Sequence, residues 1–142
     1  RPDDYWRVNQ LSVLLAAAGC TEAVPVLERV FAYTTRLGAD WREHASAYTL
    51  LRIDHHTVGN YDRMLCLAHA ASVLPDARFA PHLMRLHGLL SCPQAEPDNF
   101  YMACLDCMLL KAAKACGAER AEDALAGHAG SRYASLRRLA QS

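Results

Sequence analysis

Apolar residues recur at helical spacing along almost the whole chain, and this periodicity constrains the fold more than any other feature. The stretch 21–37 illustrates it, with one helical face formed by Val24, Leu27, Val30 and Phe31. Sustained alternation of β-branched and polar residues, which a half-buried strand requires, is nearly absent. The sequence therefore predicts an all-α domain.

Glycine, proline and acidic residues predict where these helices begin and end. Gly19, Gly38 and Gly117 each follow an apolar run, as a residue that ends a helix does, and Pro75 stops another. Asp40 is a good cap for a new helix, with Glu43 as its reciprocal partner. Helices are expected over residues 4–18 and 21–37, from residue 40 onward, and over 61–74, 76–90, 98–116, 119–126 and 131–140.

Length and charge narrow the class of protein further. A chain of 142 residues can bury one real core, and its net charge of zero creates no field that attracts nucleic acid or anionic lipid. The longest uncharged run, 8–21, is too short to span a bilayer. We expect no nucleic-acid and no membrane partner. Because the chain opens at Arg1, we expect a piece of a longer protein.

Six cysteines lie mostly in apolar, alanine-rich segments rather than in glycine- and proline-rich loops. This placement favours buried, reduced thiols in the cytoplasm over a secreted disulfide scaffold. Cys104-x-x-Cys107 is a single pair, whereas a structural zinc site needs two. Along one helix Cys116 would lie about 13 Å from Cys107, at roughly 1.5 Å per residue, so one ion could not join them. We expect no metal and no cofactor.

The stretch Asp54-His55-His56, followed by Asp62, admits two interpretations. Adjacent helical residues project about 100° apart, so two neighbouring histidines seldom bind one metal ion. The favoured interpretation is structural: the histidines sit at the end of one helix, 58–60 form a turn, and Asn60 caps the next helix. The alternative is a polar site of a small metal- or ligand-binding enzyme.

Two segments resemble each other at a separation of 56 residues. "AVPVLERVFAYTT" begins at residue 23 and "FAPHLMRLHGLLS" begins at residue 79, and the two share the pattern Pro-x-Leu-x-Arg. Each is followed by a turn and by an expected helix that an aspartate caps, Asp40 in one case and Asp98 in the other. Internal similarity of this length indicates a repeated helical unit.

The best copy, "EAVPVLERVFAYTTRLGADWREHASAYTLLRI" over 22–53, resembles HEAT-like repeats, in which a Pro-x-Leu helix precedes a helix beginning Asp-x-Arg. The second copy departs from this pattern, with Phe100 where Arg42 stands, and the separation of 56 exceeds the roughly 40–47 residues typical of the class. The resemblance implies stacked antiparallel helix pairs, a short α-solenoid or α-α superhelix, in one domain over 1–142.

The same resemblance implies a non-catalytic module for protein–protein interaction or scaffolding, with no catalytic residues of its own. In such stacks the second helices line a concave face that binds a protein partner. Contact candidates on that row are Arg42, Glu43, Asn99 and Tyr101. The alternative is a C-terminal accessory or stabilising domain of a larger enzyme, whose partner is the rest of its own chain.

Overall fold

The computed structural model describes residues 5–44, 55–90 and 100–142, with side chains described for 7–35, 62–90 and 100–142. These residues form helices and the turns between them, and no strand occurs among them. The expectation of an all-α fold is confirmed. The helices are α1 (Tyr5–Ala17), α2 (Val24–His44), α3 (His55–Val73), α4 (Ala80–Leu90), α5 (Phe100–Ala115), α6 (Ala121–Ala129) and α7 (Ala134–Gln141), with 3-10 turns η2 (Thr21–Ala23) and η4 (Ala77–Phe79).

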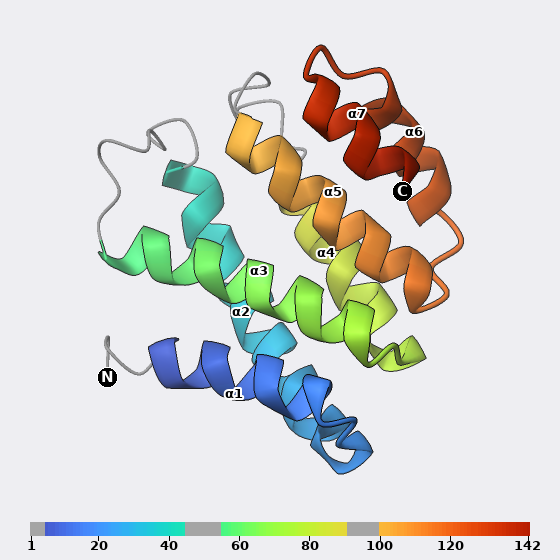
Figure 1. Ribbon diagram of the computed structural model, residues 1–142. Helices are drawn as coiled ribbons and strands as arrows, with labels where there is room; N and C mark the ends of the chain where they lie inside the picture. The colour runs from blue at the N-terminus through green and yellow to red at the C-terminus, as the bar shows by residue number, and fades with distance from the viewer. Residues whose placement is uncertain (1–4, 45–54, 91–99) are drawn as a thin grey trace.

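The helices pack in two layers and a C-terminal cover (Figure 1). In one layer α1 packs against α3, and α3 packs against α5. In the other layer α2 packs against α4, and the layers join where α2 meets α3 and α4 meets α5. The short helices α6 and α7 pack on α5 and on each other. Within the described part of the chain, no helix combines the length and the apolar character that crossing a bilayer requires.

Several helix ends lie where the sequence predicts them. α1 and α5 are each followed by a glycine in the left-handed region, Gly19 with φ 66° and Gly117 with φ 89°. This conformation is easy for glycine because it has no Cβ. The turn η4 is capped by Asp76, whose Oδ1 accepts a hydrogen bond of 2.9 Å from the amide of Arg78.

Two predicted boundaries are wrong. α2 continues through Gly38 and Asp40 to His44, so Asp40 does not cap a new helix. α3 begins at His55 and includes 58–60, so the histidines open a helix instead of closing one, and no turn separates them from Asp62. An interior glycine costs a helix only about 1 kcal/mol. A cost of that size does not by itself end a helix. The segment 45–54 lies outside the described residues.

The repeated segments form equivalent helices. Each opens with a 3-10 turn, η2 or η4, and continues into an α-helix with proline at its second position. Leu27 and Leu83 are fully buried at equivalent positions, whereas Arg29 and Arg85 are exposed at equivalent positions. The next described helix after the first unit is α3, whereas the sequence predicted a helix capped by Asp40. The next described helix after the second unit is α5. The internal similarity is therefore real, although the partner helix of its first copy was wrongly placed.

The main core lies between the two layers. Phe31 of α2 and Phe79 of η4 are fully buried, with ring centroids 5.2 Å apart. They belong to a cluster that also takes in buried side chains of α3, α4 and α5, each worth roughly 1.5–3 kcal/mol for a large apolar residue. A second, smaller cluster forms under the C-terminal cover, from Cys107, Leu110, Leu125 and Leu136.

Candidate functional site

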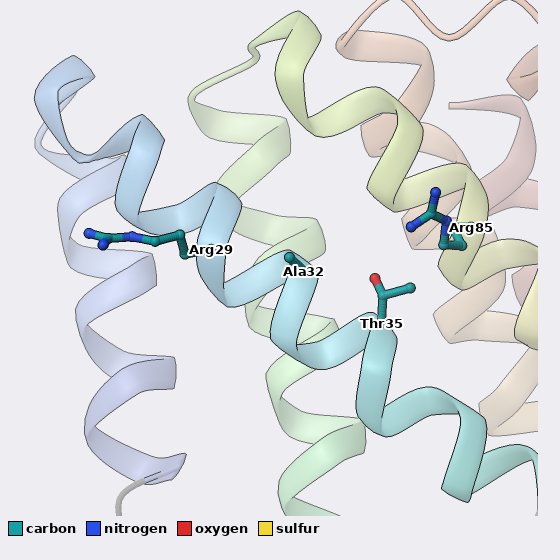
Figure 2. A pocket seen from close by; sticks show the side chains of 4 residues that line it. All are labelled: Arg29, Ala32, Thr35 and Arg85. Carbon is teal, nitrogen blue, oxygen red and sulfur yellow. The ribbon is translucent and has the colours of Figure 1, made fainter.

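A shallow groove lies between α2 and α4, with a volume of about 620 Å³ (Figure 2). Its lining comes from two helices that are equivalent in the internal repeat. α2 contributes Arg29, Ala32 and Thr35, and α4 contributes Arg85. The groove therefore lies along the contact between the two copies of the repeated segment.

Helical periodicity explains which side chains reach the groove. Arg29, Ala32 and Thr35 are three residues apart and lie along one side of α2, while Leu27 and Phe31 face the core. Ala32 is small, so it leaves room between the two helices. The hydroxyl of Thr35 donates to the carbonyl oxygen of Phe31 at 2.9 Å and is thereby satisfied. The arginines remain as the charged groups of the groove.

Arg29 and Arg85 flank the groove and do not converge on one point. In Figure 2 the guanidinium of Arg29 extends toward α1, away from Arg85 on α4. Neither arginine forms an ion pair or a side-chain hydrogen bond with another residue for which side chains are described. The groove thus presents two separate positive charges to solvent.

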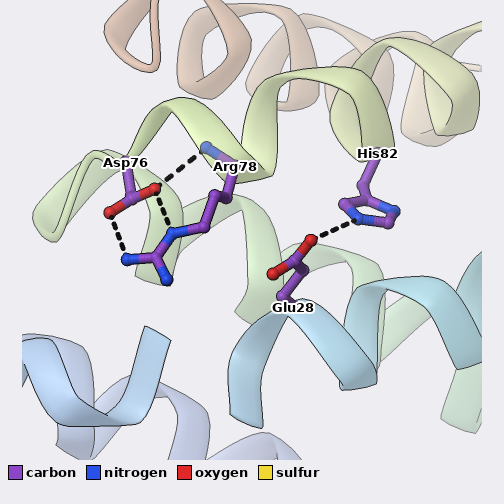
Figure 3. Close-up of polar contacts among 4 residues, drawn as sticks. All are labelled: Glu28, Asp76, Arg78 and His82. Carbon is purple, nitrogen blue, oxygen red and sulfur yellow. Dashed lines mark hydrogen bonds and ion pairs between the residues drawn. The ribbon is translucent and has the colours of Figure 1, made fainter. Parts of the chain in front are cut away.

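Two acidic residues, Asp76 before η4 and Glu28 on α2, pair with other side chains (Figure 3). Asp76 binds Arg78 through both carboxylate oxygens, at 3.0 and 3.1 Å. The hydrogen bonds from the Arg78 side chain and backbone lower the pKa of Asp76, so this carboxylate is ionised at neutral pH. Glu28 lies 3.6 Å from the Nε2 atom of His82, across the contact between α2 and α4. Neither Asp76 nor Glu28 is therefore paired with Arg29 or Arg85.

A second hollow of about 260 Å³ lies on the other side of α2, next to α1 and α3. Its walls are mainly apolar, and Arg29 borders it as well as the groove. Arg63 is 8% exposed there, with its Cζ atom 5.4 Å from the ring centroid of Tyr33. Burial lowers the pKa of Arg63. The lining residues are Val8, Val26, Arg29, Val30, Tyr33 and Arg63.

A buried carboxylate joins three helices at the other end of the domain. Asp106 of α5 is 7% exposed, and its two oxygens lie 2.6 Å from Nδ1 of His87 on α4 and 2.6 Å from Nε2 of His128 on α6. Burial alone would raise the pKa of Asp106, but the hydrogen bonds from His128 and His87 together lower it. The bond to Asp106 likewise raises the pKa of His87 against the opposing effect of burial. An ionised carboxylate between two imidazole donors is therefore favoured.

The bridge from Asp106 to His87 and His128 holds α4, α5 and α6 together.

The thiols of Cys104 and Cys107, on the same helix as Asp106, are weak nucleophiles, because burial raises both pKa values, that of Cys107 to about 11. Both cysteines lie in or against the smaller core cluster, as expected from the sequence. Among the residues with described side chains, no group of three or more histidines, cysteines and carboxylates is arranged to hold a metal ion.

The residues predicted as sites are dispersed over several helices. Tyr101 is 46% exposed in the first turn of α5, and Asp62 is half-buried in α3. Arg42 and Glu43 belong to the last turn of α2, and His55 and His56 to the first turn of α3, with side chains outside the described set. Asp54 and Asn99 lie outside the described residues. The contact and polar-site assignments therefore remain predictions.

Sequence reasoning missed Asp106, His87 and His128 as a unit. One signal was available, because Asp106 is the lone acidic residue in the apolar sequence of α5. A charged residue on a buried helical face requires a partner. The partners lie 19 and 22 residues away on other helices, and spacing cannot identify them. The recurrence of Arg29 and Arg85 was visible in the sequence, but their place beside a common groove was not.

Comparison with known proteins adds no relative. No family model matches the chain, and no curated protein or solved structure matches it significantly. The HEAT-like resemblance thus rests on the residues quoted for it.

Proposed function

We propose that this chain is a non-catalytic, HEAT-like helical-repeat module that binds another protein through the outer face of α2 and α4. One observation carries the proposal. The repeated segment places an exposed arginine at the same position of two equivalent helices, Arg29 and Arg85, and these two residues line a common groove. A repeat that served packing alone would require only the buried positions, such as Leu27 and Leu83, to recur.

The layered arrangement supports this assignment. Helix pairs in repeat proteins bury their apolar stripes against their neighbours and leave one row of helices open for binding. Here the proposed row is α2 and α4, the first helices of the two repeated segments, and not the second helices that the resemblance implies. Here the inner faces of α2 and α4 are packed against each other and against α3 and α5. Their outer faces carry exposed side chains, including Arg29, Tyr33 and Arg85. The groove between them provides a concave place for a partner segment.

The alternative function is an accessory domain that packs on the rest of a larger enzyme. A different surface favours it. Leu11 and Leu14 of α1 are 55% and 63% exposed, which places two large apolar side chains together on the outside of the edge helix. Apolar residues gathered on one surface can mark a contact with another protein part. The two functions therefore predict contacts at different surfaces, α1 in one case and the groove between α2 and α4 in the other.

Site-specific photo-cross-linking separates the two functions. A photoreactive amino acid is placed at Ala32 in the groove, at Leu14 on α1, or at exposed Ser135 on α7 as the control. The proposed module predicts one protein cross-linked at Ala32 and not at Ser135, and that protein, once purified, should bind the chain more weakly when Arg29 and Arg85 are both changed to Glu.

Two results would overturn the proposal. Specific cross-linking at Leu14 alone would favour the accessory domain. Equal cross-linking at Ala32 and Ser135, or unchanged affinity of the purified protein for the charge-reversed chain, would remove the groove as a binding face. Circular dichroism of each variant checks that the helices are retained.

A further inference from the structure

We infer that the groove between α2 and α4 binds an extended acidic peptide segment with carboxylates repeated at three-residue intervals. This inference rests on the proposed function, because it specifies the chemistry of the partner at the same face. It concerns Arg29, Arg85 and the space that Ala32 leaves between them.

Charge is the first argument. Arg29 and Arg85 are exposed and have no carboxylate partner among the described side chains, whereas Arg78 pairs with Asp76 and Lys114 pairs with Glu122. A guanidinium group binds a carboxylate through two parallel hydrogen bonds, which makes an acidic side chain its best protein ligand. Two such groups beside one groove match two acidic side chains.

The separation of the arginines is the second argument. The guanidinium of Arg29 extends toward α1, away from Arg85 (Figure 2), so a compact anion such as phosphate would not contact both as they lie. Packed helices are spaced about 8–10 Å apart, and because Arg29 points away from Arg85, the two charged groups lie further apart than the helix axes. A polyproline II segment has three residues per turn and rises about 3.1 Å per residue, so its residues i, i+3 and i+6 lie on one side at intervals of about 9 Å. Acidic residues repeated at that interval can reach one arginine on each helix.

The charge of the whole chain is the third argument. A nucleic acid is bound through many phosphate contacts and a broad basic surface. This chain has a formal net charge of zero, and Arg29 and Arg85 are the arginines that line the groove. Two separate cations on a chain without a net positive charge fit a short acidic peptide better than a phosphate backbone.

Fluorescence anisotropy with synthetic peptides tests the inference. The probe is a labelled peptide of sequence EPPEPPE, which favours polyproline II and places carboxylates at i, i+3 and i+6. The control peptide PPEEEPP has the same composition and charge but contiguous acids. We expect EPPEPPE to bind the full chain at least about fivefold more tightly than PPEEEPP, and inorganic phosphate not to compete at equal ionic strength.

Matched charge reversals identify the site. The double variant R29E/R85E should bind EPPEPPE about tenfold more weakly, because it replaces two exposed ion pairs by repulsion. The double variant R120E/R138E is the control, because these exposed arginines border neither hollow but change the net charge equally. It should alter the affinity less than twofold. Arg29→Lys with Arg85→Lys should give an intermediate loss, since lysine keeps the charge and lacks the fork.

Several outcomes would overturn the inference. Equal binding of the two peptides, or equal losses from the two double variants, would show that only overall charge matters. Tighter binding of a single-stranded RNA than of EPPEPPE would assign the face to another class of ligand. If EPPEPPE does not compete with the protein cross-linked at Ala32, the acidic segment is wrong although the binding face stands. If no protein cross-links at Ala32, the binding face itself is wrong.

Discussion

The contact of α2 with η4 and the contact among α4, α5 and α6 use opposite chemistry, although α2 and α4 are equivalent helices. Phe31 of α2 and His87 of α4 occupy the same position of the repeated segment, 56 residues apart. Phe31 packs against Phe79, which we call the apolar seam. His87 bonds to Asp106, which also receives His128, and we call this trio the polar seam. The side chain at this repeat position therefore matches its neighbour, an aromatic ring against Phe79 in the first copy and an imidazole against the Asp106 carboxylate in the second.

The apolar seam and the polar seam stabilise the fold by different interactions. Apolar burial is indifferent to pH and proportional to the area removed from water. A buried carboxylate is stabilising only while its donors are present, because leaving it alone in the interior costs several kcal/mol. We expect the apolar seam to set the overall stability and the polar seam to give that stability its pH dependence.

Removing the large ring of the apolar seam should have the largest effect. Phe31→Ala deletes a fully buried aromatic side chain and leaves a cavity between the layers. Such a change typically costs roughly 3–5 kcal/mol of unfolding free energy. Urea denaturation followed by circular dichroism measures it, and we expect the same loss at pH 5 and pH 8. A loss below about 1 kcal/mol would show that the two layers do not depend on this contact.

Removing the centre of the polar seam should have the next largest effect. Asp106→Ala takes away both hydrogen bonds, and we expect a loss of roughly 2–4 kcal/mol at pH 6. Lys114→Ala is a matched control, because Lys114 belongs to the same helix and pairs with Glu122 at the surface. Its effect should stay below about 1 kcal/mol. Equal effects of the two changes would contradict a buried, bridging role for Asp106.

The pH dependence of stability should follow the polar seam. The raised pKa of His87 makes its contribution complete below about pH 6.5 and lost as the pH rises through its folded value. The lowered pKa of Asp106 makes its contribution complete above about pH 4 and lost as the pH falls through its folded value. The urea midpoint should therefore be highest between about pH 4 and 6.5. Asp106→Ala should flatten this maximum, and a maximum that survives would assign it to other groups.

The groove arginines should contribute least to stability. Because Arg29 and Arg85 are exposed and have no described partner, R29E/R85E should change the unfolding free energy by no more than about 0.5 kcal/mol. A thermal melt compares this variant with the unaltered chain. A large loss would mean that the arginines support the contact between α2 and α4, so that a loss of binding could not be read as a loss of recognition.

Residue preferences that act within one helical turn predicted much of the fold, but they could not predict contacts between residues far apart in the sequence. Gly19, Gly117 and Pro75 were correctly assigned near helix ends, because each conformational preference acts within one turn. The same reasoning failed at Gly38, because glycine inside a helix costs only about 1 kcal/mol and does not by itself end the helix. The partners of Asp106 depend on how α4 and α6 lie against α5. No pattern along the chain contains that information.

The central claim is that Arg29 and Arg85 act as equivalent parts of one binding face. The most direct test is the dissociation constant of the EPPEPPE peptide for R29E and for R85E measured separately. The account predicts that the two single variants weaken binding to a similar extent, within about twofold of each other, as expected for equivalent positions of a repeat. An effect at one arginine and none at the other would contradict it.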